Sequence, residues 1–232
     1  MVTRTFPLAA AWLPACAVLL AQGVAAQGDP AGPEGLAALG RIGIGDLAAR
    51  GEGGCTAVLV APDQVLTATH CVTDRTTGRP AAPDRIVFAP AAAPGQPARL
   101  FVAASLTMPD RPGPIGGDRG LDVARVRLQE PVPPDLARPI ALSPPATDAP
   151  VTLAGFPVRD GTGLAVQSGC PFILAEPQVL IAACAVQQGY SGGAMLQTPD
   201  GTPRLVAIIV ARSGTAQAPQ AWAVVPPSFD TP

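Results

Sequence analysis

Short apolar runs rich in β-branched residues alternate with Gly, Pro and Asp turn residues from about residue 40 to residue 226. Residues 55–71, CTAVLVAPDQVLTATHC, contain two such runs around a Pro-Asp turn, which predicts a β-hairpin. Residues 121–128, LDVARVRL, alternate apolar and polar side chains, as a strand with one buried face does. Because no amphipathic helix and no internal repeat is evident, the pattern predicts an all-β chain.

A proline-rich connector divides the apolar runs into two groups. Residues 129–150 hold seven prolines in 22 positions, which is typical of a connector and not of a strand. We expect one domain over residues 39–232 that contains two β units. The first unit covers about residues 40–130 and the second about residues 149–227, with the connector at about 131–148. The other strands are expected in these apolar runs: 85–90, 98–106, 151–157, 163–174, 178–186, 194–198, 204–212 and 220–226.

The composition is that of a globular protein. A chain of 232 residues with 48% hydrophobic residues is long enough to bury a sizeable core. The formal net charge is −2, and the basic residues form no cluster along the chain. Nucleic acid is therefore not expected as a partner.

Residues 1–26 have the features of a signal peptide. One basic residue precedes an apolar stretch, and residues 24–26, Val-Ala-Ala, provide the small side chains of a cleavage site. A membrane anchor is the alternative, although Pro14 interrupts the stretch, and lipidation of Cys16 is another. We expect a secreted or periplasmic protein with no stable membrane insertion after signal removal, in which residues 27–38 form a flexible lead-in or short pro-segment.

Four cysteines follow the signal peptide: Cys55, Cys71, Cys170 and Cys184. An even number of cysteines in an oxidising compartment predicts disulfides, and four cysteines allow three pairings. Proximity along the chain favours Cys55–Cys71 and Cys170–Cys184. A zinc site is the alternative, but no pair has the spacing of metal ligands.

One histidine, His70, stands at the end of the predicted hairpin, and Ser191 lies between glycines in QGYSGG. A serine hydroxyl becomes a nucleophile when an imidazole removes its proton, and a buried carboxylate orients that imidazole. Asp122 leads directly into the alternating strand and is the preferred carboxylate. The other aspartates between base and serine lie mostly among turn residues: Asp74, Asp84, Asp110, Asp118, Asp135, Asp148 and Asp160.

These segments resemble those around the catalytic residues of chymotrypsin/trypsin-like serine proteases. TATHC resembles the family's T-A-A-H-C, LDVARVRL its aspartate strand, and QGYSGGAM its G-D-S-G-G-P. The resemblance spans about residues 40–226 and implies two six-stranded antiparallel β-barrels with the active site in the cleft between them. It implies His70 as base, Asp122 as its orienting acid and Ser191 as nucleophile, with no cofactor and no metal. The cysteine spacing before Ser191 resembles the bacterial exported branch, the trypsin-like and glutamyl-endopeptidase-like enzymes.

The resemblance also implies an oxyanion hole formed by the amides of Gly189 and Ser191. The same motif satisfies G-x-S-x-G, the nucleophile elbow of α/β-hydrolases. That fold needs a histidine after the serine, and no histidine follows Ser191. The elbow is therefore excluded.

The chain departs from the family pattern at several positions. Tyr190 replaces the acid or amide before the nucleophile, so activation by insertion of a new N-terminus is not expected. Ala185 stands at the floor of the specificity pocket, and Ile209 and Val210 are expected in its wall. An apolar pocket favours a small or medium neutral side chain before the scissile bond.

The sequence thus predicts an exported serine endopeptidase that acts on protein or peptide substrates. One alternative is a protease-fold binding protein in which Tyr190 disables the oxyanion hole. A second is a serine esterase on the same scaffold. The oligomeric state is left open.

Overall fold

A computed structural model describes Met1 and residues 36–45, 54–91, 99–109, 122–158, 163–176 and 178–226. Apart from Met1, the predicted signal peptide at residues 1–26 lies outside the described residues. The lead-in predicted at residues 27–38 lies outside them up to residue 35. Within the described ranges, no helix is long and apolar enough to cross a membrane.

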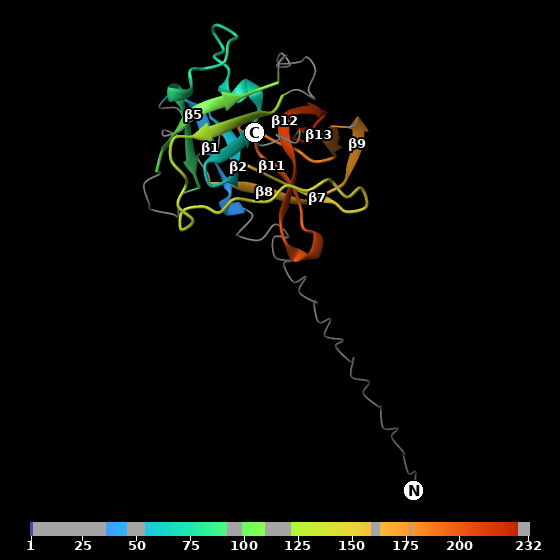
Figure 1. Cartoon of the computed structure of the whole chain (residues 1–232). Coiled ribbons are helices and arrows are strands. Elements are labelled where there is room, and N and C mark those ends of the chain that lie inside the picture. Colours follow the sequence, from blue (N-terminus) through green and yellow to red (C-terminus); the bar gives the residue numbers. More distant parts are fainter. Residues whose placement is uncertain are drawn as a thin grey trace.

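The first half of the chain forms a closed barrel of antiparallel strands in the order β1-β2-β3-β6-β5-β4 (Figure 1). The hairpin predicted at residues 55–71 is confirmed, since β2 pairs with β3 and places Val58 opposite Leu66. The alternating segment 121–128 supplies β6, which lies between β3 and β5. The strands are β1 (Leu39–Ile44), β2 (Cys55–Ala61), β3 (Gln64–Thr67), β4 (Ile86–Pro90), β5 (Phe101–Thr107) and β6 (Ala124–Leu128).

The second half forms a seven-stranded sheet in the order β8-β7-β11-β12-β13-β10-β9. Its two edge strands, β8 and β9, are separated by Pro171 alone, so the sheet must curl until its edges meet at that corner. Proline has no N–H to donate and interrupts a strand. The strands are β7 (Val151–Gly155), β8 (Ala165–Cys170), β9 (Phe172–Glu176), β10 (Val179–Ala182), β11 (Ala194–Gln197), β12 (Arg204–Gly214) and β13 (Pro219–Val224).

The all-β, two-barrel architecture expected from the sequence is thereby confirmed. The second barrel differs in detail from a closed six-stranded one, because it is a curled sheet that is counted as seven strands. If β8 and β9 are taken as one strand bent at Pro171, six strands remain. The bend lies at Pro171, which has no N–H to donate to a hydrogen bond between strands.

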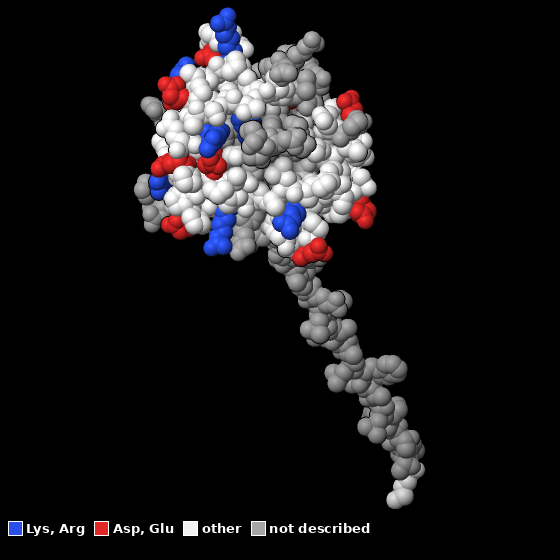
Figure 2. Space-filling model, in the orientation of Figure 1, with Lys and Arg blue, Asp and Glu red and all other residues white. Residues whose placement is uncertain are grey.

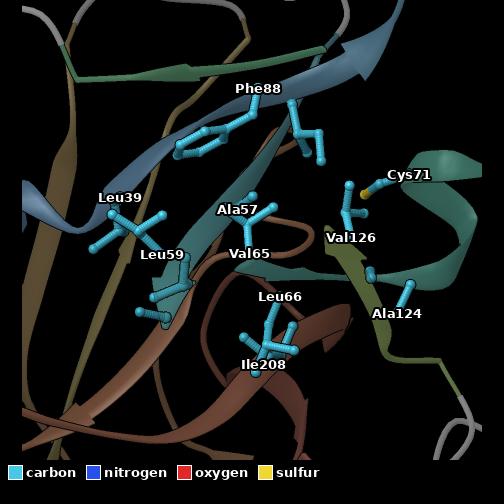
Figure 3. Packing of buried hydrophobic residues seen from close by; sticks show 14 of the residues in the cluster. Leu39, Ala57, Leu59, Val65, Leu66, Cys71, Phe88, Ala124, Val126 and Ile208 are labelled. Atoms are coloured by element: carbon cyan, nitrogen blue, oxygen red, sulfur yellow. The ribbon is translucent and has the colours of Figure 1, made fainter. Parts of the chain in front are cut away.

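Strand β12 is buried on both faces because it lies between two hydrophobic clusters. Ile208 and Val210 belong to the cluster that fills the first barrel and continues between the barrels, where Figure 3 shows Ile208 with Leu66. Ala207 and Ile209 belong to the cluster inside the second barrel. Burial of both faces explains why this strand has a continuous apolar run where β6 has an alternating one.

Both disulfides favoured by sequence proximity are present. Cys55 bonds to Cys71 and Cys170 bonds to Cys184. Cys55 begins β2, and Cys71 lies in a short 3₁₀ helix, η1 (Thr69–Val72), directly after β3. The first disulfide therefore ties the end of the hairpin to its start.

Removal of either disulfide is expected to lower the free energy of unfolding by about 3 kcal/mol, through loop-closure entropy. The two bridges span similar separations of 16 and 14 residues, so the variants C55S/C71S and C170S/C184S should lose similar amounts. Urea denaturation of each variant beside the oxidised parent measures this. A loss confined to one of the two variants would contradict the loop-closure explanation.

Candidate active site

His70 lies in η1, where the chain leaves β3 at the rim of the first barrel. Its Nδ1 is 2.8 Å from Oδ2 of Asp122, and its backbone N–H donates to Oδ1 of the same carboxylate over 3.1 Å. Register explains the proximity, because Thr67 pairs with Ala124 and the two chain ends leave the sheet together. The Asp122 carbonyl also accepts from the Thr69 N–H over 3.3 Å.

This pair determines how the imidazole is protonated. An ionised carboxylate only accepts hydrogen bonds, so Nδ1 of His70 carries the proton that faces Asp122. Nε2 is then the basic nitrogen, available to take a proton from another group. The side chains of His70 and Asp122 are 18% and 14% exposed, which keeps most water away from their contact.

Ser191 lies in the loop between β10 and β11, and we call residues 187–193 of it the Ser191 loop. The Tyr190 N–H donates to the Gln187 carbonyl over 3.2 Å, and the Gly193 N–H donates to the Tyr190 carbonyl over 2.7 Å. Gly192 donates to Ile209 on β12 over 2.7 Å. The loop is thus anchored to itself and to the second barrel.

Gly192 also places this loop against the chain segment that carries His70. It has a φ of +79°, and a Cβ there would lie 2.0 Å from the Thr56 carbonyl oxygen and 2.2 Å from Thr67 Oγ1. Only glycine fits such a backbone and such a close approach. Thr67 is three residues before His70, so the Ser191 loop packs against the segment that leads to the candidate base.

A second link joins Ser191 to His70 through the first disulfide. The Thr56 N–H donates to the Ser191 carbonyl over 2.8 Å. Thr56 follows Cys55, whose partner Cys71 follows His70. Within the described ranges the Ser191 hydroxyl makes no hydrogen bond, so its proton is not committed to another acceptor. The hydrogen bond between a catalytic serine and its histidine is commonly long or poorly aligned before substrate binds.

Two amides of the Ser191 loop point away from the carbonyls that anchor it. The Gln188 carbonyl accepts from the Val158 N–H over 2.9 Å, so the Gly189 N–H of the same trans peptide points in the opposite direction. The Ser191 N–H is likewise opposite the Tyr190 carbonyl, which Gly193 holds. Neither amide donates to an acceptor among the described residues. These are the two amides expected from the sequence in an oxyanion hole.

The ring of Tyr190 packs inside the second barrel. Tyr190 is 5% exposed, and a Cβ on Gly155 of β7 would lie 2.9 Å from its Cγ. The ring therefore fills the space above Gly155, within the cluster of buried side chains of that barrel. Burial raises the pKa of the Tyr190 phenol, because the anion would lose its hydration.

The stability of the fold is expected to decrease at alkaline pH because of Tyr190. Since burial places its folded pKa above the unfolded value of about 10, the unfolded chain releases this proton first as pH rises. The contribution of the Tyr190 proton to the free energy of unfolding is complete below about pH 10 and is lost as pH rises above it. Tyr190→Phe should lack this alkaline loss of stability. Tyr190 is the only tyrosine, so tyrosinate absorbance measures it alone. Equal titration midpoints for folded and urea-unfolded protein would contradict this.

The three residues expected in a specificity pocket differ from one another in exposure. Ala185 is exposed on the chain before the Ser191 loop. Ile209 and Val210 are 1% and 4% exposed, and their side chains belong to the two different core clusters. Side chains this deeply buried support β12 from within and contribute little surface of their own.

A cavity of about 370 Å³ opens beside His70. The disulfide Cys55–Cys71, Ile44 and the exposed Arg75 are among its lining residues. Space next to the imidazole is what a substrate or leaving group needs.

On the face in Figure 2 basic and acidic residues are scattered among a majority of uncharged ones.

Three potential metal ligands gather at this point, but they do not form a metal site. Ligand atoms of Cys55, His70 and Cys71 lie within 4.8 Å of one another. The two sulfurs are bonded to each other, and Nδ1 of His70 faces Asp122. Cysteine binds a metal as a thiolate, and the two sulfurs of a disulfide carry no thiolate.

Two residues of the site have no signal in the sequence. Thr56 donates its hydroxyl to the Gly189 carbonyl, and Val158 donates its N–H to the Gln188 carbonyl. Both contacts join segments that are distant in sequence. They become visible once the two barrels are packed together.

A family model for the trypsin-like peptidase domain matches residues 55–208, about two thirds of the chain. The matched range contains His70, Asp122 and Ser191. No curated protein matches the chain closely enough to count as a relative. With a closed barrel, a curled second barrel and this match, the chain belongs to the trypsin-like peptidase domain family.

Proposed function

We propose that the protein is an exported serine endopeptidase in which His70, Asp122 and Ser191 act as a triad. One observation carries the proposal: His70 is held by Asp122 at 2.8 Å beside a serine loop that has two amides without acceptors in the described chain. A base, its orienting acid and an anion site are the parts that acyl transfer requires. Family membership supports a peptidase.

In the proposed mechanism the Ser191 Oγ attacks the carbonyl carbon of the scissile peptide bond. Nε2 of His70 takes the hydroxyl proton, and Asp122 stays ionised and stabilises the imidazolium. The carbonyl oxygen becomes negative and accepts from the amides of Gly189 and Ser191. His70 then returns the proton to the leaving amine, and water hydrolyses the acyl-enzyme by the same steps.

The substrate class is protein or peptide, and we propose a small or medium neutral residue before the scissile bond. The proposal rests on Ala185, an exposed residue that offers no charge to a substrate side chain. Two disulfides support a secreted or periplasmic location, since such bonds persist in oxidising compartments. The bacterial exported branch remains part of the proposal.

A peptide library cleaved by the purified mature protein and identified by mass spectrometry tests this function. We expect cuts after small and medium neutral residues, and none with Ser191→Ala prepared in the same way. No cleavage by folded, disulfide-bonded wild-type protein would contradict the endopeptidase and favour the binding protein. Hydrolysis of esters without peptides would favour the esterase.

A further inference from the structure

Thr56 is a threonine of the first barrel whose polar groups contact the second barrel. It is fully buried on β2, directly after Cys55. Its hydroxyl donates to the Gly189 carbonyl over 2.7 Å and accepts from the Phe156 N–H over 2.9 Å. Its backbone N–H donates to the Ser191 carbonyl over 2.8 Å. One residue thus contacts two carbonyls of the Ser191 loop.

The contact at Gly189 holds a peptide of that loop that follows a glycine with positive φ. Gly189 has a φ of +103°, a conformation in which glycine alone moves freely. The peptide before it is held by Val158, and the peptide after it is held by the Thr56 hydroxyl. With both peptide planes held, the Gly189 N–H has one direction. Preorganised donors of this kind are what stabilise a developing oxyanion.

The hydroxyl of Thr56 is also fully used. A threonine hydroxyl has one proton to donate, which goes to Gly189, and it accepts from the Phe156 N–H. Its loss would leave a buried carbonyl and a buried N–H without partners. The Gly189–Tyr190 peptide would then keep only the bond from the Tyr190 N–H to the Gln187 carbonyl. Rotation about φ and ψ of Gly189 would then strain the Val158 bond that sets the direction of the Gly189 N–H.

We propose that Thr56 is a positioning residue that holds the Gly189 amide in the direction required for the oxyanion. The inference rests on the proposed serine peptidase function. Through Cys55 and its disulfide to Cys71, Thr56 is also joined to the segment that carries His70. It therefore couples the base on one barrel to the oxyanion site on the other.

The test compares variants that differ only in this hydroxyl. Thr56→Val keeps the shape of the side chain, and Thr56→Ser keeps the hydroxyl. We expect Thr56→Val to lower kcat by about tenfold to a hundredfold with little change in KM, because misplaced groups act mainly on the transition state. Thr56→Ser should recover most of kcat. Thr56→Ala beside Thr56→Ser gives a second pair with the same difference if the valine variant does not fold.

Inhibitors provide a measurement that a purely structural role would not change. A peptide aldehyde adds the Ser191 oxygen to its carbonyl carbon and places the resulting negative oxygen at the oxyanion position. Its inhibition constant in Thr56→Val should rise in step with the loss of kcat, while that of a product peptide should stay constant. Thr152→Val is the matched control, since it removes another buried hydroxyl, bonded to Ser168 and not to the loop.

The outcomes separate this inference from the function on which it rests. Wild-type protein without turnover overturns the proposed function before any Thr56 variant is compared. An active wild type whose folded Thr56→Val or Thr56→Ala variant keeps kcat and aldehyde affinity overturns the role of Thr56 alone. If neither hydroxyl-free variant folds, Thr56 is a folding residue and the positioning role is likewise overturned.

Discussion

Ser191→Ala is expected to lower kcat for peptide hydrolysis by about 10⁶-fold, because it removes the proposed nucleophile. His70→Ala should cost about as much, since the serine hydroxyl is a poor nucleophile without its base. The two residues act as one unit. The double variant should therefore be no slower than either single variant, and kcat on one peptide substrate measures all three.

Labelling with a fluorophosphonate provides the control for this expectation. The probe forms a covalent phosphonate ester with an activated serine and releases fluoride. Intact mass and peptide mapping should find one adduct, on Ser191, and no adduct in Ser191→Ala or His70→Ala. Both variants should keep the wild-type urea midpoint. An adduct on a different serine, or equal labelling of His70→Ala, would be incompatible with the proposed triad.

Asp122→Asn is expected to lower kcat by about 10⁴-fold while the fold is preserved. The His70 N–H donates to Oδ1 and Nδ1 faces Oδ2, so an asparagine must satisfy both positions. Its oxygen would accept from the backbone N–H, which leaves the amide NH₂ facing Nδ1. Nδ1 must then accept, the proton moves to Nε2, and the base is lost.

The matched controls for Asp122→Asn are two surface acids. Asp63→Asn and Asp200→Asn also remove one carboxylate each, but neither residue lies near His70 in the described structure. Their kcat should equal that of the wild-type protein. An Asp122→Asn variant with near-normal kcat would mean that another group sets the tautomer of His70. That result would contradict the proposed role of Asp122 as the orienting acid.

The local parts of this protein were predictable because they depend on neighbours in the sequence. The hairpin at residues 55–71 follows from two apolar runs and a Pro-Asp turn, and its disulfide from the proximity of Cys55 and Cys71. The placement of Asp122 at the start of an alternating strand also follows from pattern. In each case a short segment contains both the signal and its partner.

The Ser191 loop shows where such prediction ends. From sequence, Tyr190 is an aromatic ring in a loop that must turn tightly, and it raises the possibility of an inactive protein. In the structure the ring is buried over Gly155, where the absence of a side chain leaves room for it. Tyr190 and Gly155 are on different strands and loops of the second barrel, so no periodicity relates them.

The pattern along the chain thus predicted the all-β architecture, favoured the two disulfide pairs and located the segments that hold the candidate catalytic residues. The direction of the Gly189 amide depends on hydrogen bonds from Val158 and Thr56, which form between distant segments. Thr56 is 133 positions from Gly189 and 100 from Phe156. A hydrogen bond depends on distance in space and not on separation in sequence. Contacts between such distant residues therefore form only when the two barrels pack against each other.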